Sequence, residues 1–354
     1  MNAQTTTRLA WALWVLSVML AALTTLFYSL SISIPLEGRD RPPPEFLPVL
    51  LIAVLVFSTV GALVASRRPE NAIGWIFCVL GVTLGAAFSA QFYADYSLIV
   101  RPGSLPGGGI AIWSLSWTAP VLSTAPTFVL LLFPNGRLLS HRWRPVAWLA
   151  VGAAAMSVVG LAFQPGTLDE DHPSVTNPFG IGGRVGEVLD LISSVGAALA
   201  TVALLLSLVS MVVRFWRSRG EEHQQIKWIA YAGAIMITAF LLTEVVSGGG
   251  LISDLVWAAG FVALVGLPIA VGVAILKYRL YDIDVVINRT LVYGSLTVTL
   301  ALTYSGSVAL LQYLLRTLTA QETQLAVVAS TLAIAALFQP LRRRIQELID
   351  RRLY

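Results

Sequence analysis

The sequence is poor in charged residues. Asp, Glu, Lys and Arg make up only 12% of it, hydrophobic residues make up 56%, and the mean hydropathy is +0.78. Globular proteins carry roughly 25% charged residues. The charges are missing in long blocks, which excludes an ordinary soluble domain because no stretch of soluble character is long enough to bury its own core. The net charge of +4 comes from basic residues that flank these blocks. This placement favours membrane topology over nucleic-acid binding.

Cysteine and catalytic motifs are also scarce. Cys78 is the single cysteine, which excludes an internal disulfide and a cysteine-based metal site, and we expect it to be a small core residue. The histidines fall in predicted loops, and no HExxH, GxSxG or Walker A motif occurs. We therefore expect no enzymatic activity, no cofactor and no metal site.

The charge-free blocks predict an all-α, polytopic integral membrane protein of about ten transmembrane helices. Each block can supply the roughly 20 residues that cross a bilayer core, and none alternates with the period of two that a barrel strand requires. The first block is longer than the apolar part of a signal peptide and is expected to be retained. The predicted spans lie near 9–34, 46–66, 71–94, 110–133, 145–164, 190–213, 228–246, 255–276, 290–315 and 323–341.

The positive-inside rule gives these spans an orientation. With the N-terminus in the cytoplasm, 18 of the 23 Lys and Arg residues fall on cytoplasmic segments. We therefore predict that both termini are cytoplasmic and that residues 1–338 form a transmembrane bundle. Residues 339–354 then form an amphipathic cytoplasmic exit helix.

Small residues and prolines predict local features of the spans. Gly81 and Gly85 form a GxxxG pattern, for which close packing within the chain is the default interpretation and a dimer contact the less common one. Pro120, Pro126 and Pro268 predict kinks.

Several acidic residues are predicted to lie near the extracytoplasmic ends of spans. An acid within a span indicates a functional site, and Glu244 is the most deeply placed. The alternative is that these acids mark water-exposed helix ends, where Asp190 and Asp254 also cap helix N-termini. The candidate ligand or gating residues are Asp95, Glu187, Asp190, Glu244 and Asp254. No ionisable residue is predicted at the middle of a span, which argues against an ion-coupled transporter.

The predicted cytoplasmic segments combine arginines with tryptophan or tyrosine. They are 66–75, 132–145, 217–228 and 278–290. Such residues anchor helix ends at the membrane surface, and Asn71 is a candidate to pair with the arginines and hold these ends together. A candidate coupling network in the last segment consists of Arg279, Asp282, Asp284, Asn288 and Arg289. The alternative is that these charged groups are simply solvated.

The exit helix follows the last predicted span through Arg342-Arg-Arg344. Leu341, Ile345 and Leu348 fall close to one face of it, which is typical of the apolar seam of a two-stranded coiled coil. This pattern predicts a homodimer.

The cytoplasmic segments together resemble a known family. The chain is similar to the membrane input half of bacterial sensor histidine kinases related to peptide-pheromone quorum-sensing kinases. The resemblance runs across the whole chain and is strongest over Lys277–Tyr293 and Gln339–Tyr354. The resemblance implies a two-component sensor in a bacterial cytoplasmic membrane, with a kinase or response regulator as output. The input half of such kinases holds no catalytic residue, so the resemblance carries no autokinase activity to these residues.

The sequence therefore favours a membrane-embedded signal-input module. Its partners would be the bilayer, a second copy of the chain and a cytoplasmic output protein or domain, and not nucleic acid. The alternative from another class is a transporter or channel for a small apolar or lipid-like solute, gated by the acids listed above.

Overall fold

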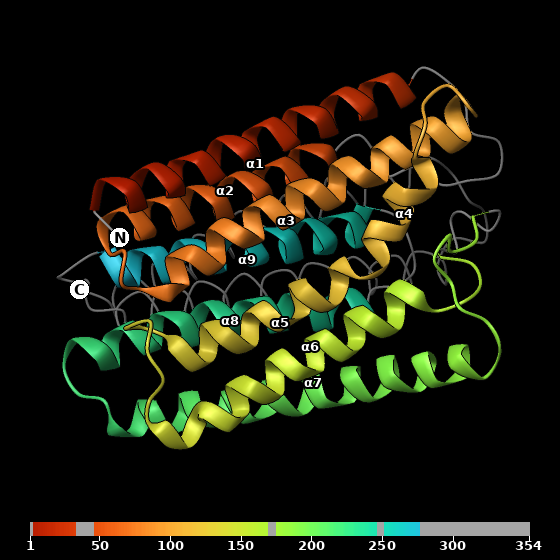
Figure 1. Cartoon of the computed structure of the whole chain (residues 1–354). Helices are drawn as coiled ribbons and strands as arrows, with labels where there is room; N and C mark the ends of the chain where they lie inside the picture. The colour runs from red at the N-terminus through yellow and green to blue at the C-terminus, as the bar shows by residue number, and fades with distance from the viewer. Residues whose placement is uncertain (1–2, 33–45, 169–174, 246–250, 277–354) are drawn as a thin grey trace, which may run out of the picture. The chain divides into compact units, whose positions relative to one another are not determined.

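The computed structural model describes residues 3–32, 46–168, 175–245 and 251–276. In these residues every regular element is a helix (Figure 1). The α-helices are α1 (Ala3–Ile32), α2 (Phe46–Arg67), α3 (Ala72–Asp95), α4 (Gly108–Ser116), α5 (Thr118–Leu132), α6 (Arg144–Phe163), α7 (Gly183–Arg217), α8 (Glu221–Val245) and α9 (Leu251–Leu276). A π-helical turn, η1 (Tyr96–Val100), and a 3-10 turn, η2 (His141–Trp143), complete them. The all-α prediction is confirmed for this part of the chain.

Seven helical stretches of the described residues are long and apolar enough to cross a membrane: Gln4–Ser31, Leu47–Arg67, Ala72–Val100, Gly108–Leu132, His141–Phe163, Gly183–Arg217 and Ala259–Leu276. Each coincides with a predicted span. A further predicted span, 228–246, falls in α8, which begins with the polar residues Glu221-Glu-His-Gln-Gln225 and is not among the seven. The spans predicted at 290–315 and 323–341 and the exit helix at 339–354 lie outside the described residues.

The predicted fourth span is two helices rather than one. It breaks at Trp117, between α4 and α5. Pro120 is the third residue of α5, where a missing N–H costs no intrahelical bond, and its ring would clash with the carbonyl of Ser116 if α4 continued. The predicted kink at Pro120 is thus a helix boundary, whereas Pro126 and Pro268 lie inside α5 and α9.

Helix α7 is longer than its predicted span of 190–213. It contains 35 residues and begins at Gly183, with Gly182 as its N-cap residue. A bilayer core requires roughly 20 residues of helix, so α7 is longer than the core is thick. The prediction that Asp190 caps this helix is therefore wrong, because Asp190 lies two turns inside it.

Helices α1, α2 and α3 pack against one another through small residues. A Cβ atom at Gly81 would lie 2.7 Å from Cβ of Ser58 on α2, and one at Gly61 would lie 2.4 Å from the backbone nitrogen of Cys78 on α3. A Cβ atom at Gly85 would lie 3.0 Å from Leu20 on α1. The close-packing interpretation of the GxxxG pattern is confirmed within the chain, and Cys78 is fully buried as expected.

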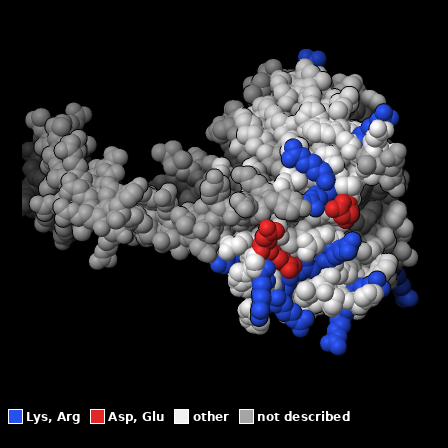
Figure 2. Space-filling model, turned by 90° about the vertical axis from the view of Figure 1, so that its left-hand side faces the viewer, with Lys and Arg blue, Asp and Glu red and all other residues white. Residues whose placement is uncertain are grey.

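The remaining helices form two further groups. Helices α5, α6 and α7 pack together, and α8 packs along α9, which also contacts α2. Figure 1 shows that successive spans run in opposite directions along the chain, so that α1, α3, α6 and α8 begin at the end where α2, α5, α7 and α9 finish. We call this the basic end of the bundle. Its exposed arginines are Arg8, Arg67, Arg137, Arg142, Arg144, Arg217 and Arg219 (Figure 2).

The largest apolar core cluster joins the groups. It contains Phe57, Ile73, Phe77, Val129, Phe133, Met211, Ile226, Ile229, Val271 and Ala274. These residues come from α2, α3, α5, α7, α8 and α9, and from the residue that follows α5. Most of them lie within a few turns of the basic end, so the core is deepest where the helices meet there.

Candidate functional site at the basic end

Asn71 connects the start of α3 to the segment that follows α5. Its Oδ1 accepts a hydrogen bond of 3.0 Å from the backbone N–H of Ile73, which caps α3, and its Nδ2 donates one of 2.8 Å to the carbonyl of Pro134. The side chain is buried. The side-chain amide supplies the acceptor and the donor on two separate atoms. The partners are backbone groups, so the prediction that Asn71 pairs with an arginine is wrong, although it does join these helix ends.

Arg214, near the end of α7, is the most buried charged residue in the described part of the chain, at 3% exposed. Its Nη1 donates to the carbonyl of Phe133, and its Nη2 donates to the carbonyls of Leu131 at 3.3 Å and Arg137 at 2.8 Å. The last carbonyls of a helix lack intrahelical partners and carry partial negative charge. The guanidinium of α7 therefore completes the C-terminus of α5.

The segment between α5 and α6 is held between Asn71 and Arg214. It contains a cis peptide bond between Phe133 and Pro134 and a glycine, Gly136, at φ +70°. A Cβ atom at Gly136 would lie 2.7 Å from both the backbone nitrogen of Ala72 and Oδ1 of Asn71. Glycine is required here on two grounds, the left-handed backbone and the close approach to the start of α3.

Gln225 extends these connections to the last described helix. Its Nε2 donates a hydrogen bond of 2.8 Å to the carbonyl of Ala274, near the end of α9. Glu222, one turn earlier on α8, lines a polar cavity at this end. Asn71, Arg214 and Gln225 thus each donate to a backbone carbonyl of another element at this end of the bundle. The acceptors belong to α5, to the segment that follows it and to α9.

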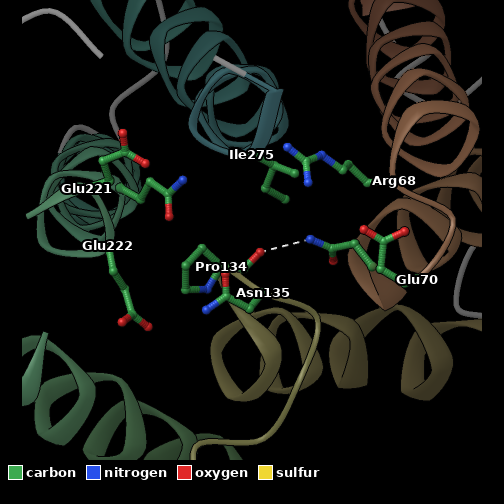
Figure 3. Close-up of a pocket in the computed structure, with 9 residues that line it drawn as sticks. Arg68, Glu70, Pro134, Asn135, Glu221, Glu222 and Ile275 are labelled. Atoms are coloured by element: carbon green, nitrogen blue, oxygen red, sulfur yellow. Dashed lines mark hydrogen bonds between the residues drawn. The ribbon is translucent and has the colours of Figure 1, made fainter. Parts of the chain in front are cut away.

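A polar cavity of about 300 Å³ lies among these elements (Figure 3). Its charged lining consists of Arg68, Glu70, Glu221 and Glu222, and the remaining wall is formed by Asn71, Pro134, Asn135, Gln225 and Ile275. Three carboxylates against one guanidinium give the cavity an excess of negative charge, while the surrounding surface is basic. The lining belongs to the α2–α3 turn, the segment after α5, the start of α8 and the end of α9.

A second cavity, of about 490 Å³, lies between α5, α6 and α7. It has no charged lining residue, and its polar lining residues are hydroxyl-bearing: Ser123, Thr124, Ser157, Ser193, Ser194 and Thr201. Ser193 donates to the carbonyl of Asp190 and Thr201 to that of Ala197, so these hydroxyls are satisfied within their own helix. The cavity suits an apolar occupant.

The predicted acidic site is only partly visible. Asp95 accepts a 3.3 Å hydrogen bond from Gln91 on its own helix, Asp190 accepts one of 2.5 Å from Gln164, and Glu187 is exposed. Asp95 belongs to α3 and the other two belong to α7, and these helices are not packing neighbours. The structure therefore does not bring Asp95 together with Glu187 and Asp190. The side chains of Glu244 and Asp254 are outside the described residues.

The other predicted sites fall where the structure gives no description. The coupling network Arg279, Asp282, Asp284, Asn288 and Arg289 lies outside the described residues, as does the seam Leu341, Ile345 and Leu348. Among the residues that are described, no group of three or more His, Cys, Asp or Glu side chains is placed to hold a metal ion.

Sequence reasoning missed Arg214 and Gln225. In the sequence Arg214 is one of the many basic residues that flank an apolar block. The available signal was its position directly after the apolar block of α7, three residues before Arg217. Gln225 carried no signal of its own.

Comparison with family models, curated proteins and solved structures finds no match to this chain.

Proposed function

We propose that this chain is a signal-input module of a bacterial cytoplasmic membrane. It has ten transmembrane helices and both termini in the cytoplasm, and it relays an extracytoplasmic or intramembrane stimulus to a cytoplasmic output. The seven apolar helical stretches support the membrane location. The gathering of exposed arginines at one end supports the orientation, because such residues are retained on the cytoplasmic side.

One observation carries the proposal. The segment between α5 and α6 is bonded by Asn71 of the α2–α3 turn and by Arg214 of α7, and Gln225 joins α8 to the end of α9 beside it. A change in helix packing at any of these elements displaces a backbone carbonyl that another element bonds. Such a junction can have two discrete arrangements, which signal relay requires. In the chain, α9 is followed by the last two predicted spans.

The output is proposed to be a kinase or response regulator acting on a homodimer. The dimer forms through the seam of Leu341, Ile345 and Leu348, and the stimulus reaches it as a rotation, tilt or shift of the exit helix. No catalytic step is assigned to this chain.

The test joins the catalytic region of a histidine kinase in helical phase after Tyr354 and measures autophosphorylation in membranes. We expect Asn71→Asp, which keeps the cap of α3 but loses the donor to Pro134, to change basal phosphorylation several-fold. Inserting one to four residues after Tyr354 should make the signal vary with the helical repeat of about 3.6 residues.

The matched control is Asn177→Asp. Asn177 makes the same two kinds of hydrogen bond at the other end of the bundle: its Oδ1 accepts from the N–H of Phe179, and its Nδ2 donates to the carbonyls of Ala162 and Gln164. If autophosphorylation changes neither in Asn71→Asp nor in the insertion variants, relay through the basic end is ruled out.

The second cavity favours a second candidate function, the transport of a small apolar or lipid-like solute. Its uncharged lining between α5, α6 and α7 is suited to such a solute. Uptake into vesicles that is abolished by Glu244→Gln, with the protein still folded, would support transport. Unchanged uptake in that variant and in a variant that fills the cavity, Ser157→Leu, would exclude it.

A further inference from the structure

Helices α6 and α7 each present an exposed apolar stripe that ends in a tryptophan near the basic end. On α7 the stripe is Leu205, Val209, Val212 and Trp216, at the spacing of one helix face. On α6 the corresponding residues are Val159, Val151 and Trp148. Trp216 is 78% exposed and Trp148 is 73% exposed, so neither ring packs into the protein.

Arginines stand directly beyond these tryptophans. Arg144 lies one helical turn before Trp148 on α6, and Arg217 and Arg219 follow Trp216. All three are exposed, as is Arg142. Residues 137–163 and 191–219 contain no Asp or Glu at all. The acids of the basic end, Glu70, Glu221 and Glu222, line the polar cavity instead.

Toward the basic end, each helix therefore presents an apolar stripe, then a tryptophan and then an arginine. Tryptophan prefers the boundary between acyl chains and headgroups, and arginine just beyond it reaches the phosphates, which its planar guanidinium can bind through two hydrogen bonds. Because α6 and α7 pack side by side in opposite directions, the two tryptophan–arginine pairs occur at the same end of one helix pair.

We propose that this surface, made of Arg144, Trp148, Trp216, Arg217 and Arg219, binds the headgroups of anionic phospholipids. The stripes contact the acyl chains, the tryptophans lie at the glycerol level and the arginines bind the phosphates. The surface selects acidic lipids over zwitterionic ones because its three arginines carry a net positive charge, while Glu221 and Glu222, which follow Arg219, line the polar cavity. The inference is independent of whether the chain relays a signal or moves a solute.

The test reconstitutes the full chain into phosphatidylcholine vesicles that contain a minor fraction of phosphatidylglycerol with brominated acyl chains. Bromine quenches nearby tryptophans, and brominated phosphatidylcholine in a parallel series gives the reference. Wild-type protein should be quenched at a lower fraction of the anionic lipid than of the neutral one. The difference should shrink with salt. Trp148→Phe/Trp216→Phe should remove the selective part of the quenching.

The variant Arg144→Gln/Arg217→Gln/Arg219→Gln should lose at least about ten-fold in lipid selectivity, since each arginine near an anionic surface contributes roughly five-fold. The control Arg8→Gln/Arg67→Gln/Arg101→Gln removes the same amount of charge elsewhere and should keep most of the lipid selectivity. The triple change of Arg144, Arg217 and Arg219 to lysine preserves the charge and should retain more than half of the selectivity on a logarithmic scale.

Three results overturn the proposal. The first is equal quenching by the two brominated lipids, and the second is equal loss in the control and test variants. The third is displacement of phosphatidylglycerol by soluble glycerol phosphate or by polyglutamate. Such displacement identifies a free phosphate or an acidic protein as the occupant.

Discussion

The two ends of the bundle use the same chemical device over very different distances along the chain. Asn71 and Asn177 are both buried, both accept a hydrogen bond from the N–H two residues later, and both donate to a remote carbonyl. Asn71 reaches 63 residues along the chain, to Pro134, whereas Asn177 reaches 15 and 13 residues, to Ala162 and Gln164.

The remaining side-chain hydrogen bonds differ less sharply between the two ends. At the basic end Arg214 bonds carbonyls 77 to 83 residues away. At the opposite end Trp113 donates to Ala162, and Gln164 donates to Asp190. The longest hydrogen-bonded separations thus occur at the basic end, where α7 and the start of α3 bond the segment after α5. At the opposite end the described contacts join α1 to α3 through ring contacts and α4 to α6 and α6 to α7 through hydrogen bonds. A disturbance at the basic end should therefore affect more of the molecule.

The largest expected effect is the loss of the Arg214 guanidinium. Arg214→Met leaves the carbonyls of Leu131, Phe133 and Arg137 without a donor, and each unsatisfied buried group costs about 1–3 kcal/mol. We expect a total loss of about 3–5 kcal/mol in the free energy of unfolding, measured by denaturant titration in mixed micelles. Arg217→Met, on the same helix but exposed, should cost less than about 0.5 kcal/mol. Equal losses would show that Arg214 is not a structural donor.

The next effect separates backbone strain from close packing. Gly136 and Gly103 have nearly the same φ, +70° and +75°, but a Cβ atom would meet Ala72 and Asn71 at Gly136 and nothing within 4 Å at Gly103. Gly103→Ala should cost about 1–2 kcal/mol of unfolding free energy from the left-handed backbone alone. Gly136→Ala should cost about 1–3 kcal/mol more, because it also displaces the start of α3. If thermal unfolding gives equal costs, the segment after α5 does not contact α3 as described.

The smallest effect compares the two asparagines directly. Asn71→Asp and Asn177→Asp each keep the acceptor and lose the donor, at a cost of about 1–2 kcal/mol in unfolding free energy. We expect similar losses of unfolding free energy in the two variants, but in different sets of helices. Hydrogen exchange should rise in α3, α5 and α7 for the Asn71 variant, and mainly near 162–182 for the Asn177 variant. The same pattern of exchange in both variants would remove the distinction between the ends.

How much was predictable varied from residue to residue. Cys78 and the Gly81–Gly85 pattern were interpreted correctly because burial in a membrane helix follows from residue size and local composition. The helix break at Trp117 was anticipated only as a kink, since the position of a break depends on which carbonyl the Pro120 ring approaches. The N-terminal extension of α7 was missed because Arg184 and Glu187 interrupt the apolar block without interrupting the helix.

The sequence by itself determined the helical class, the apolar stretches and the gathering of arginines at one end, because these depend on hydrophobicity and charge along a single segment. Only the tertiary structure decided which arginine is buried. Arg214 and Arg217 stand three residues apart on one helix, yet one bonds the C-terminus of α5 and the other is exposed. That difference comes from a partner about 80 residues away in the chain, and the local sequence marks Arg214 only as the first arginine after an apolar block.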